Sequence, residues 1–316
     1  MNTTPPCVIA IGETVMDILF RKDGDNDNYQ PLASTPGGST FNSIISIGRS
    51  GVPCAFIGYA GNDIIGRQTR QYLSNNNVQT EYFRLYDNHK SSLALAFLDK
   101  DGNAQYDFYK DTPHLQDNWP LPHFTAHDIL ILGSYYAISP GTRPQVRDVV
   151  TRADTARSVI YYDINFRRTH QAELDSLLPA IQWNMQHSDI VRGSADDFDI
   201  MFGTRDADQI YTDYIRPYCQ TFIYTSGAGK ILCYANGRCM DFHAQAIPPH
   251  QVVSTVGAGD NFNAGIICQL IRNNICKADI PTLGTSDYAS LIHTGIHFAS
   301  TVCRLPGNNV PEGFKY

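Results

Sequence analysis

Apolar segments of strand length alternate with helical patterns through the middle of the chain, and this alternation constrains the fold most strongly. The apolar runs lie at residues 129–133, 159–162, 190–191 and 221–225. Helical patterns lie between them at residues 172–185, 195–202 and 206–214. Another helix is expected to start at Ser139-Pro140, because proline suits a first helical turn. Strands that are apolar throughout predict a parallel sheet covered on both faces, with ligands bound at the carboxyl ends of its strands.

Charge and length exclude several classes of function. The chain has 316 residues, of which 42% are apolar, which is enough for one large α/β domain. Its net charge of −7 argues against nucleic-acid or anionic-membrane partners, which need basic patches. No segment approaches the roughly 20 apolar residues that span a bilayer. We therefore expect no nucleic-acid partner and no membrane partner.

The cysteines and the N-terminus indicate the compartment. The eight cysteines are scattered through apolar segments, and none belongs to a Cys-x-x-Cys pair. This distribution is typical of free thiols in a reducing environment. Residues 1–10 lack the basic start and long apolar run of a signal peptide. The sequence therefore predicts a cytoplasmic protein.

One stretch near the C-terminus combines very small residues with a single carboxylate. Gly257-Ala258-Gly259 precedes apolar residues at helical spacing, so a helix is expected to begin there. Small residues allow close approach of a ligand, and the free amides of a first helical turn attract anions. Asp260 beside such a site would repel an anion unless a reaction needs it. A base that deprotonates a hydroxyl, while amides of residues 256–259 stabilise a transferring phosphoryl group, explains the arrangement.

Two motifs resemble those of the PfkB/ribokinase family of carbohydrate kinases. Thr255-Val256-Gly257-Ala258-Gly259-Asp260 resembles the family's C-terminal signature, and Pro36-Gly37-Gly38-Ser39-Thr40-Phe41-Asn42 resembles its N-terminal motif. The similarity covers essentially the whole chain and is strongest to bacterial fructokinases. It implies one ribokinase-like domain over residues 1–316, a three-layer α/β/α sandwich with a mostly parallel central sheet. A small β-sheet lid is expected from strands inserted at about 15–34 and 91–112.

The resemblance also implies which residues hold the sugar and which perform the chemistry. Asp17 matches a family aspartate that binds sugar hydroxyls, and carboxylates accept such charge-assisted hydrogen bonds well. Asp260 is implied as the base, with Gly257, Ala258 and Gly259 as the anion-stabilising turn. Further sugar contacts are implied for the glycine pair, the helix after it, a lid residue and an Asp-x-Asn-x-Arg segment: Gly37, Gly38, Asn42, Tyr109, Asn165 and Arg167.

The nucleotide side of the site departs from the family in three places. The family's Asn-x-x-Glu, which organises Mg²⁺ through water, is here Ser194-x-x-Asp197. Thr225 to Gly229 resembles the nucleotide loop, in which Gly227 and Gly229 contact phosphate, but Gly229 comes one residue early. Val256 completes the implied nucleotide contacts. The family's monovalent-cation site usually begins with an aspartate where this chain has Ser254, so K⁺ activation stays open.

The expected activity is transfer of the γ-phosphoryl group of ATP, with Mg²⁺, to a sugar hydroxyl. Fructose is favoured as the acceptor, from the Asp-x-Asn-x-Arg segment and the lid. Ribose, 2-keto-3-deoxygluconate and a nucleoside remain open, as does a regulator that binds sugar or nucleotide without turnover. Tyrosine and phenylalanine side chains on one face of the lid predict a homodimer through the lid, since such faces are usually covered.

Overall fold

The computed structural model describes residues 7–22, 28–98, 104–111, 119–227 and 229–316. Its main sheet has ten strands, in the order β14-β13-β12-β11-β10-β9-β1-β4-β5, with β6 also paired to β4. The strands are β1 (Val8–Ile11), β4 (Cys54–Gly61), β5 (Val78–Gln79), β6 (Phe83–Tyr86), β9 (Ile129–Gly133), β10 (Val159–Asp163), β11 (Ile190–Ser194), β12 (Phe222–Ser226), β13 (Lys230–Ala235) and β14 (Arg238–His243).

The strands from β4 to β12 pair in parallel, which confirms the predicted mostly parallel sheet. Only β13 and β14 pair antiparallel, as a hairpin at one edge. The sequence reading missed this hairpin, although Asn236-Gly237 is a strong hairpin signal. Both residues have positive φ, 52° and 73°, as a type I′ turn requires.

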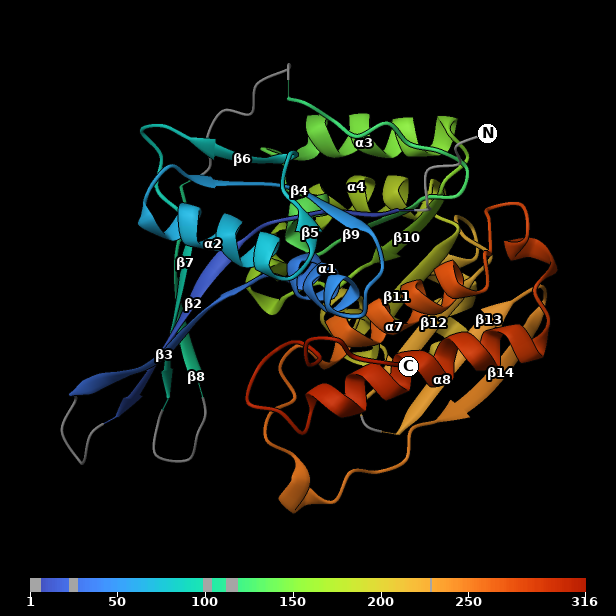
Figure 1. The fold of residues 1–316 in the computed structure, drawn as a ribbon. Coiled ribbons are helices and arrows are strands. Elements are labelled where there is room, and N and C mark those ends of the chain that lie inside the picture. The colour runs from blue at the N-terminus through green and yellow to red at the C-terminus, as the bar shows by residue number, and fades with distance from the viewer. Residues whose placement is uncertain (1–6, 23–27, 99–103, 112–118, 228) are drawn as a thin grey trace.

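Helices cover both faces of the sheet (Figure 1). One layer contains α1 (Ser39–Arg49), α2 (Ile64–Asn75), α7 (Ala258–Arg272) and α8 (Thr285–Val302). The other contains α3 (Arg143–Thr155), α4 (Leu174–Gln186), α5 (Ala195–Phe202) and the short α6 (Ala207–Ile210). Alternate residues of β1 serve the two cores: Val8 and Ala10 face the first layer, and Ile9 and Ile11 face the second. This is the expected three-layer sandwich.

Short helical turns connect these elements. They are η1 (Tyr135–Ala137), η2 (Arg168–Glu173), η3 (Tyr211–Ile215, a π turn), η4 (Pro249–Gln251) and η5 (Ile280–Thr282). The predicted helix start at Ser139-Pro140 was wrong, because α3 begins at Arg143 and has Pro144 in its first turn. Across the residues that the structure describes, no helix combines the length and apolar composition needed to cross a bilayer.

A separate four-stranded sheet projects from the main body, at the left of Figure 1, and forms the lid. Its order is β3-β2-β7-β8, made of β2 (Val15–Lys22), β3 (Tyr29–Gly37), β7 (Leu93–Leu98) and β8 (Ala104–Tyr109). Strands β7 and β8 pair antiparallel. Residues 23–27, 99–103 and 112 of the two expected lid insertions lie outside the described residues.

Candidate active site

Asp260 stands in the first turn of α7, where the start of α1 holds its carboxylate in place. Ser39 Oγ donates a hydrogen bond to Oδ1 over 2.8 Å, and Asn42 Nδ2 donates one to Oδ2 over 2.9 Å. Ser43 Oγ donates to the Asp260 backbone carbonyl over 2.8 Å. The two predicted motifs, more than two hundred residues apart in sequence, therefore meet at one carboxylate.

The surroundings make Asp260 a better base than an ordinary aspartate. Burial raises its pKa to about 6, and the charge of Asp163 acts in the same direction. The hydrogen bonds from Asn42 and Ser39 and the charge of Arg167 lower the pKa and limit the rise. The side chain is therefore ionised at neutral pH, and its affinity for a proton exceeds that of an exposed carboxylate.

A buried polar network fixes the start of α7. Gly257 caps the helix with φ of 79°, and a Cβ there would lie 2.9 Å from the Asn308 carbonyl oxygen. Asn261 Nδ2 donates to the carbonyl oxygens of Gly257 and Asn308, over 2.8 and 2.7 Å. Ser46 of α1 donates to Asn261 Oδ1 over 2.5 Å. The turn that carries Asp260 is thus fastened to α1 and to the C-terminal loop.

Two of the predicted anion-binding amides already have acceptors. Val256 N donates to Ser254 Oγ over 3.1 Å, and Ala258 N donates to the Thr255 carbonyl over 3.2 Å. The amides of Gly257 and Gly259 have no acceptor in the part of the chain that the structure describes. These two amides are therefore the ones ready to receive an anion.

The lid brings a second carboxylate to the site. Asp17 lies against the glycine pair, because a Cβ on Gly37 would come within 2.3 Å of Asp17 Oδ2. Gly38, with φ of 135°, lets the chain pass so close to Glu13 that a Cβ would lie 2.4 Å from its carbonyl oxygen. Burial, together with the charges of Glu13 and Asp260, raises the pKa of Asp17 to about 6. Asp17 and Asp260 therefore border the same small region.

Sequence reasoning missed a contact between the lid and the main body. Lys110 follows β8, and its Nζ donates to Glu13 Oε2 over 3.0 Å. The same ammonium lies 5.7 Å from the ring centroid of Tyr135, which stacks on His170 at 3.6 Å. Ligands of parallel α/β sheets bind at the carboxyl ends of the strands. Glu13 and Tyr135 follow the carboxyl ends of β1 and β9, so this rule could have pointed to both residues from the sequence.

The register of the lid separates Tyr109 from the other predicted sugar contacts. Asp17 pairs with Ala94, and Ala94 pairs with Phe108, so these three share one face of the lid. Tyr109 points to the opposite face and is 59% exposed. The structure does not bring Tyr109 to the two carboxylates. Phe108, rather than Tyr109, lies on the same face of the lid as Asp17.

The Asp-x-Asn-x-Arg segment follows β10 and reaches the same site. Asn165 is buried, with a positive φ of 39°. Arg167 is exposed, and its positive charge lowers the pKa of Asp260. Asp163 is buried and accepts hydrogen bonds from Arg192 and Asn263 over 3.0 and 2.8 Å. Asp163 is therefore part of a buried network, whereas Arg167 is accessible to a ligand.

The altered Ser194-x-x-Asp197 segment forms the N-terminal cap of α5. Asp197 Oδ2 accepts from Ser194 N over 2.6 Å and from Ser194 Oγ over 2.8 Å, which is a capping box. Asp197 is buried, and burial raises its pKa. These contacts give both residues a structural role, and the predicted contact of Asp197 with a metal through water stays a prediction.

The predicted nucleotide loop follows β12 next to this cap. Thr225 Oγ1 accepts a hydrogen bond from Arg192 over 2.7 Å, so its hydroxyl is already engaged. Gly227 has a φ of 55°, and Gly229 N donates to the Ser226 carbonyl over 3.4 Å. Ala228 lies outside the described residues. The loop therefore stands at the carboxyl end of β12, beside the start of α5.

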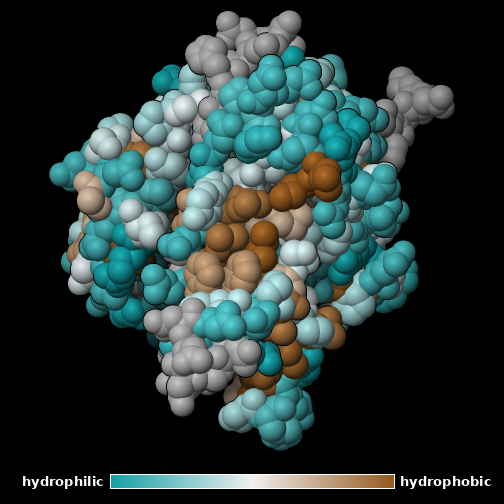
Figure 2. Space-filling view, turned by 90° about the vertical axis from the view of Figure 1, so that its left-hand side faces the viewer, coloured by the Kyte–Doolittle hydropathy of each residue, from teal (hydrophilic) through white to brown (hydrophobic). Residues whose placement is uncertain are grey.

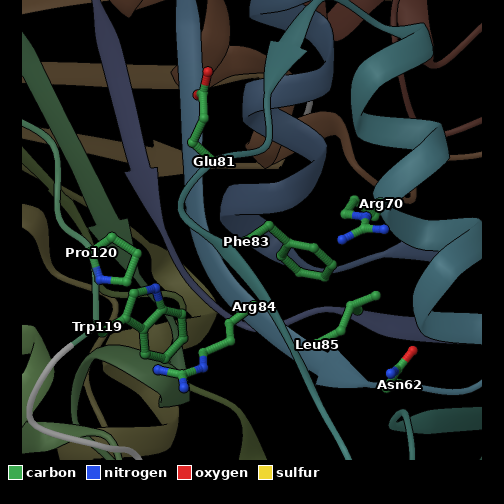
Figure 3. A pocket seen from close by; sticks show the side chains of 8 residues that line it. All are labelled: Asn62, Arg70, Glu81, Phe83, Arg84, Leu85, Trp119 and Pro120. Atoms are coloured by element: carbon green, nitrogen blue, oxygen red, sulfur yellow. The ribbon is translucent and has the colours of Figure 1, made fainter.

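A cavity of about 510 Å³ lies apart from all these residues (Figure 3). Its lining combines two arginines with aromatic and aliphatic side chains from α2, β6 and the segment before β9: Asn62, Arg70, Glu81, Phe83, Arg84, Leu85, Trp119 and Pro120. None of them is a predicted site residue. The cavity therefore has no part in the arrangement around Asp260.

Comparison with known proteins identifies the family. The family model described as pfkB family carbohydrate kinase matches residues 6–311. The chain belongs to this family. It is accordingly a sugar kinase, a phosphotransferase with an alcohol group as acceptor.

Similar proteins carry more than one substrate name. The fructokinase of Rhizobium leguminosarum bv. trifolii is 27% identical over 281 residues, which cover 85% of this chain and 81% of that protein. The aminoimidazole riboside kinase of Salmonella typhimurium is 28% identical over 272 residues, which cover 84% and 82%. Identity at this level supports a sugar kinase and leaves its substrate open.

Solved structures share the fold over nearly the full length. Aminoimidazole riboside kinase from Salmonella enterica superposes with a TM-score of 0.78 at 24% identity, covering 97% of this chain and 96% of that one. Fructokinase from Vibrio cholerae O395, in its form with fructose, ADP and calcium ion, gives a TM-score of 0.80 at 18% identity, covering 96% and 94%. These similarities confirm the ribokinase-like fold.

Proposed function

We propose that Asp260 is the general base of an ATP-dependent sugar kinase. The observation that carries this proposal is the placement of its carboxylate. It lies beside the free amides of Gly257 and Gly259, is oriented by Ser39 and Asn42, and stands near Asp17. The sugar hydroxyl oxygen attacks the γ-phosphorus of ATP, its proton passes to Asp260, and ADP leaves. The two amides stabilise the negative charge that spreads over the phosphoryl oxygens.

The sugar is proposed to bind between the lid and α1. Asp17 accepts hydrogen bonds from sugar hydroxyls, and the close-packed backbone at Gly37 and Gly38 lets the sugar approach. Asn42 bonds Asp260 through Nδ2, while its buried Oδ1 has no partner among the described residues. This oxygen is available to accept a bond from a sugar hydroxyl, which lets Asn42 position base and substrate together.

Magnesium is proposed to arrive with ATP. The described residues contain no group of three or more His, Cys, Asp or Glu side chains arranged to hold a metal ion. Mg²⁺ is commonly held by nucleotide phosphates and water with few protein ligands. Asp197 is the residue we propose to contact it through water. When bound, the ion neutralises charge on the β- and γ-phosphates.

Fructose is the acceptor that we favour. Support comes from the Asp-x-Asn-x-Arg segment with Arg167 at the site, and from relatives that bear the name fructokinase. An aminoimidazole riboside is the second candidate, because relatives of that name are equally similar. A deoxygluconate-type substrate needs a cation for its charge, for which Arg167 is the candidate.

A panel of acceptors tests the proposal. ADP release is measured with fructose, ribose, 2-keto-3-deoxygluconate, aminoimidazole riboside and fructose 6-phosphate. We expect the highest kcat/KM with fructose. Turnover of another acceptor at tenfold higher kcat/KM would replace fructose while keeping the kinase. ADP release with none of them, together with tight sugar binding in calorimetry, would favour the regulator.

The lid is proposed to form a homodimer interface. The face of the lid opposite Asp17 carries half-buried apolar residues, and this outer lid face consists of Ile18, Phe20, Tyr29, Leu95 and Phe97. Phe97 stacks on Phe20 and meets Tyr29 edge-on, both at 5.1 Å. Figure 2 looks onto this side of the molecule and shows apolar residues gathered in a band. A second copy of the lid would cover this band.

A further inference from the structure

Arg192 is a buried cation that sequence reasoning did not assign. It lies in β11 and is 8% exposed. Its Nη1 donates to Asp163 Oδ1 over 3.0 Å, and its Nη2 donates to Thr225 Oγ1 over 2.7 Å. Because β10, β11 and β12 are neighbours in the sheet, this one guanidinium ties together three adjacent strands near their carboxyl ends.

The guanidinium also lies directly against the turn that precedes Asp260. A Cβ on Gly259 would come within 3.3 Å of both Nη1 and Nη2, which is tighter than an ordinary contact. Glycine at this position therefore allows Arg192 to approach the backbone of the first turn of α7. The same side chain donates to Thr225 in the predicted nucleotide loop, so it contacts both that loop and the Gly259 turn.

The local charges argue against a purely structural role. Asp163, Asp197 and Asp260 all lie around this region, since the charge of Asp163 raises the pKa of the other two. Three carboxylates would repel a phosphoryl group. The charges of Asp163 and Asp197 keep the pKa of Arg192 above its ordinary value, so its positive charge persists at every relevant pH.

Arg192 keeps an unused hydrogen-bond donor beside the start of α7. The N-terminal end of a helix carries roughly half a positive charge, so a cation beside α7 is disfavoured there. Asp163 accepts from Arg192 through one oxygen and from Asn263 through the other. Arg192 Nε is buried and has no hydrogen-bond partner among the described residues. Both features fit a site completed by a bound anion.

We propose that Arg192 is a positioning residue for phosphoryl transfer, holding the Gly259 turn and Thr225 at a fixed separation while offsetting the carboxylates around the phosphate. This inference rests on the proposed use of the Gly257–Gly259 turn for the γ-phosphoryl group. Loss of the link would misplace the amides at the reaction step, with little effect on sugar binding, because Arg192 bonds neither Asp17 nor the described part of the lid.

Substitution of Arg192 separates this role from a structural one. In Arg192→Gln, kcat is expected to fall about 10²-fold, because misplacement by 1 Å has an effect of this size. KM for the sugar should stay within threefold. Arg192→Lys keeps the charge without the forked link, so its kcat should lie between that of Arg192→Gln and the unsubstituted protein. Arg205→Gln is the matched control, because Arg205 likewise forms an ion pair with aspartate side chains but is exposed.

A double-mutant cycle tests the contact itself. Gly259→Ala places a methyl group against the guanidinium, and kcat should fall about tenfold. In the Arg192→Gln background the shorter side chain leaves room, so the same methyl should lower kcat less than threefold. If the fold-losses in kcat of the two single substitutions simply multiply in the double variant, the inference is overturned. So would a kcat within twofold of normal in folded Arg192→Gln, or, if that variant does not fold, in Arg192→Lys. Failure of the base proposal is separate, since it would show only in Asp260 variants.

Discussion

The junction of α1 with α7 and the lid meet at the same site but are built in opposite ways. At the junction, Asp260 and Asn261 take hydrogen bonds from α1, and Asn309 Nδ2 donates to the Asn42 carbonyl over 3.0 Å. The lid contributes Asp17 on one face and an incompletely covered apolar surface on the other. The junction therefore fixes the orientation of the Asp260 carboxylate, while the lid places Asp17 at the site and leaves its other face half-buried.

Replacing the base at the junction should have the largest effect. Asp260→Asn keeps the shape of the side chain but removes the proton acceptor, so kcat should fall on the order of 10²–10⁴-fold. ATP affinity should stay within a few-fold, as measured by calorimetry. Asp196→Asn, at an exposed carboxylate in α5, is the control. Near-full turnover by Asp260→Asn would remove the base from the mechanism.

Replacing the lid carboxylate should act on binding more than on chemistry. Asp17→Asn loses charge-assisted hydrogen bonds to the sugar, so KM for the sugar should rise about 10–100-fold. We expect the accompanying fall in kcat to be smaller than that of Asp260→Asn in steady-state assays. Asp107→Asn, on the opposite face of the same sheet, is the matched control. If Asp17→Asn and Asp260→Asn lower kcat equally, the lid carboxylate does not differ in role from the junction carboxylate.

Acid should lower the kinase activity, by protonating Asp260 at the junction, before it unfolds the protein. Because the pKa values of Asp260 and Asp17 are both raised to about 6, kcat/KM should fall at least about tenfold for each pH unit below 6. A profile that is flat down to pH 5 would contradict this assignment.

The same raised pKa predicts the sign of a stability change. The folded state binds the proton more tightly than the unfolded state, so stability falls as pH rises from about 4 to about 6. Above pH 6 the ionised carboxylate is a cost to the fold. Asp260→Asn should therefore have a higher Tm than the unsubstituted protein at pH 7 and lose that advantage at pH 4. A lower Tm at pH 7 would argue that the carboxylate is stabilising.

Substitution on the outer lid face should affect association with little change in chemistry. Phe97→Ser disrupts the stacked aromatic group, so sedimentation should shift from dimer to monomer, with kcat changed less than a few-fold. Ile64→Ser, at an exposed apolar residue of α2, is the control. A monomer at micromolar concentration before substitution would remove the proposed interface.

Several features of this protein could be read from its sequence. The alternation of apolar strands with helices predicted the parallel sheet, and the bounds of β9 and α5 came out as expected. Two glycine-containing motifs were enough to assign the family and to select Asp260. These signals are local, since periodicity and the backbone demands of a helix start depend on neighbouring residues.

Only the tertiary structure decided which groups surround Asp260. The bonds from Ser39 and Asn42 cross more than two hundred residues, and the contact of Arg192 with the Gly259 turn depends on three adjacent strands. The face of the lid on which Tyr109 lies follows from strand register rather than from composition. Such relations depend on packing between distant segments. The sequence alone therefore singled out Asp260 as the proposed base, and the folded chain determined its basicity, its orientation and the buried cation near it.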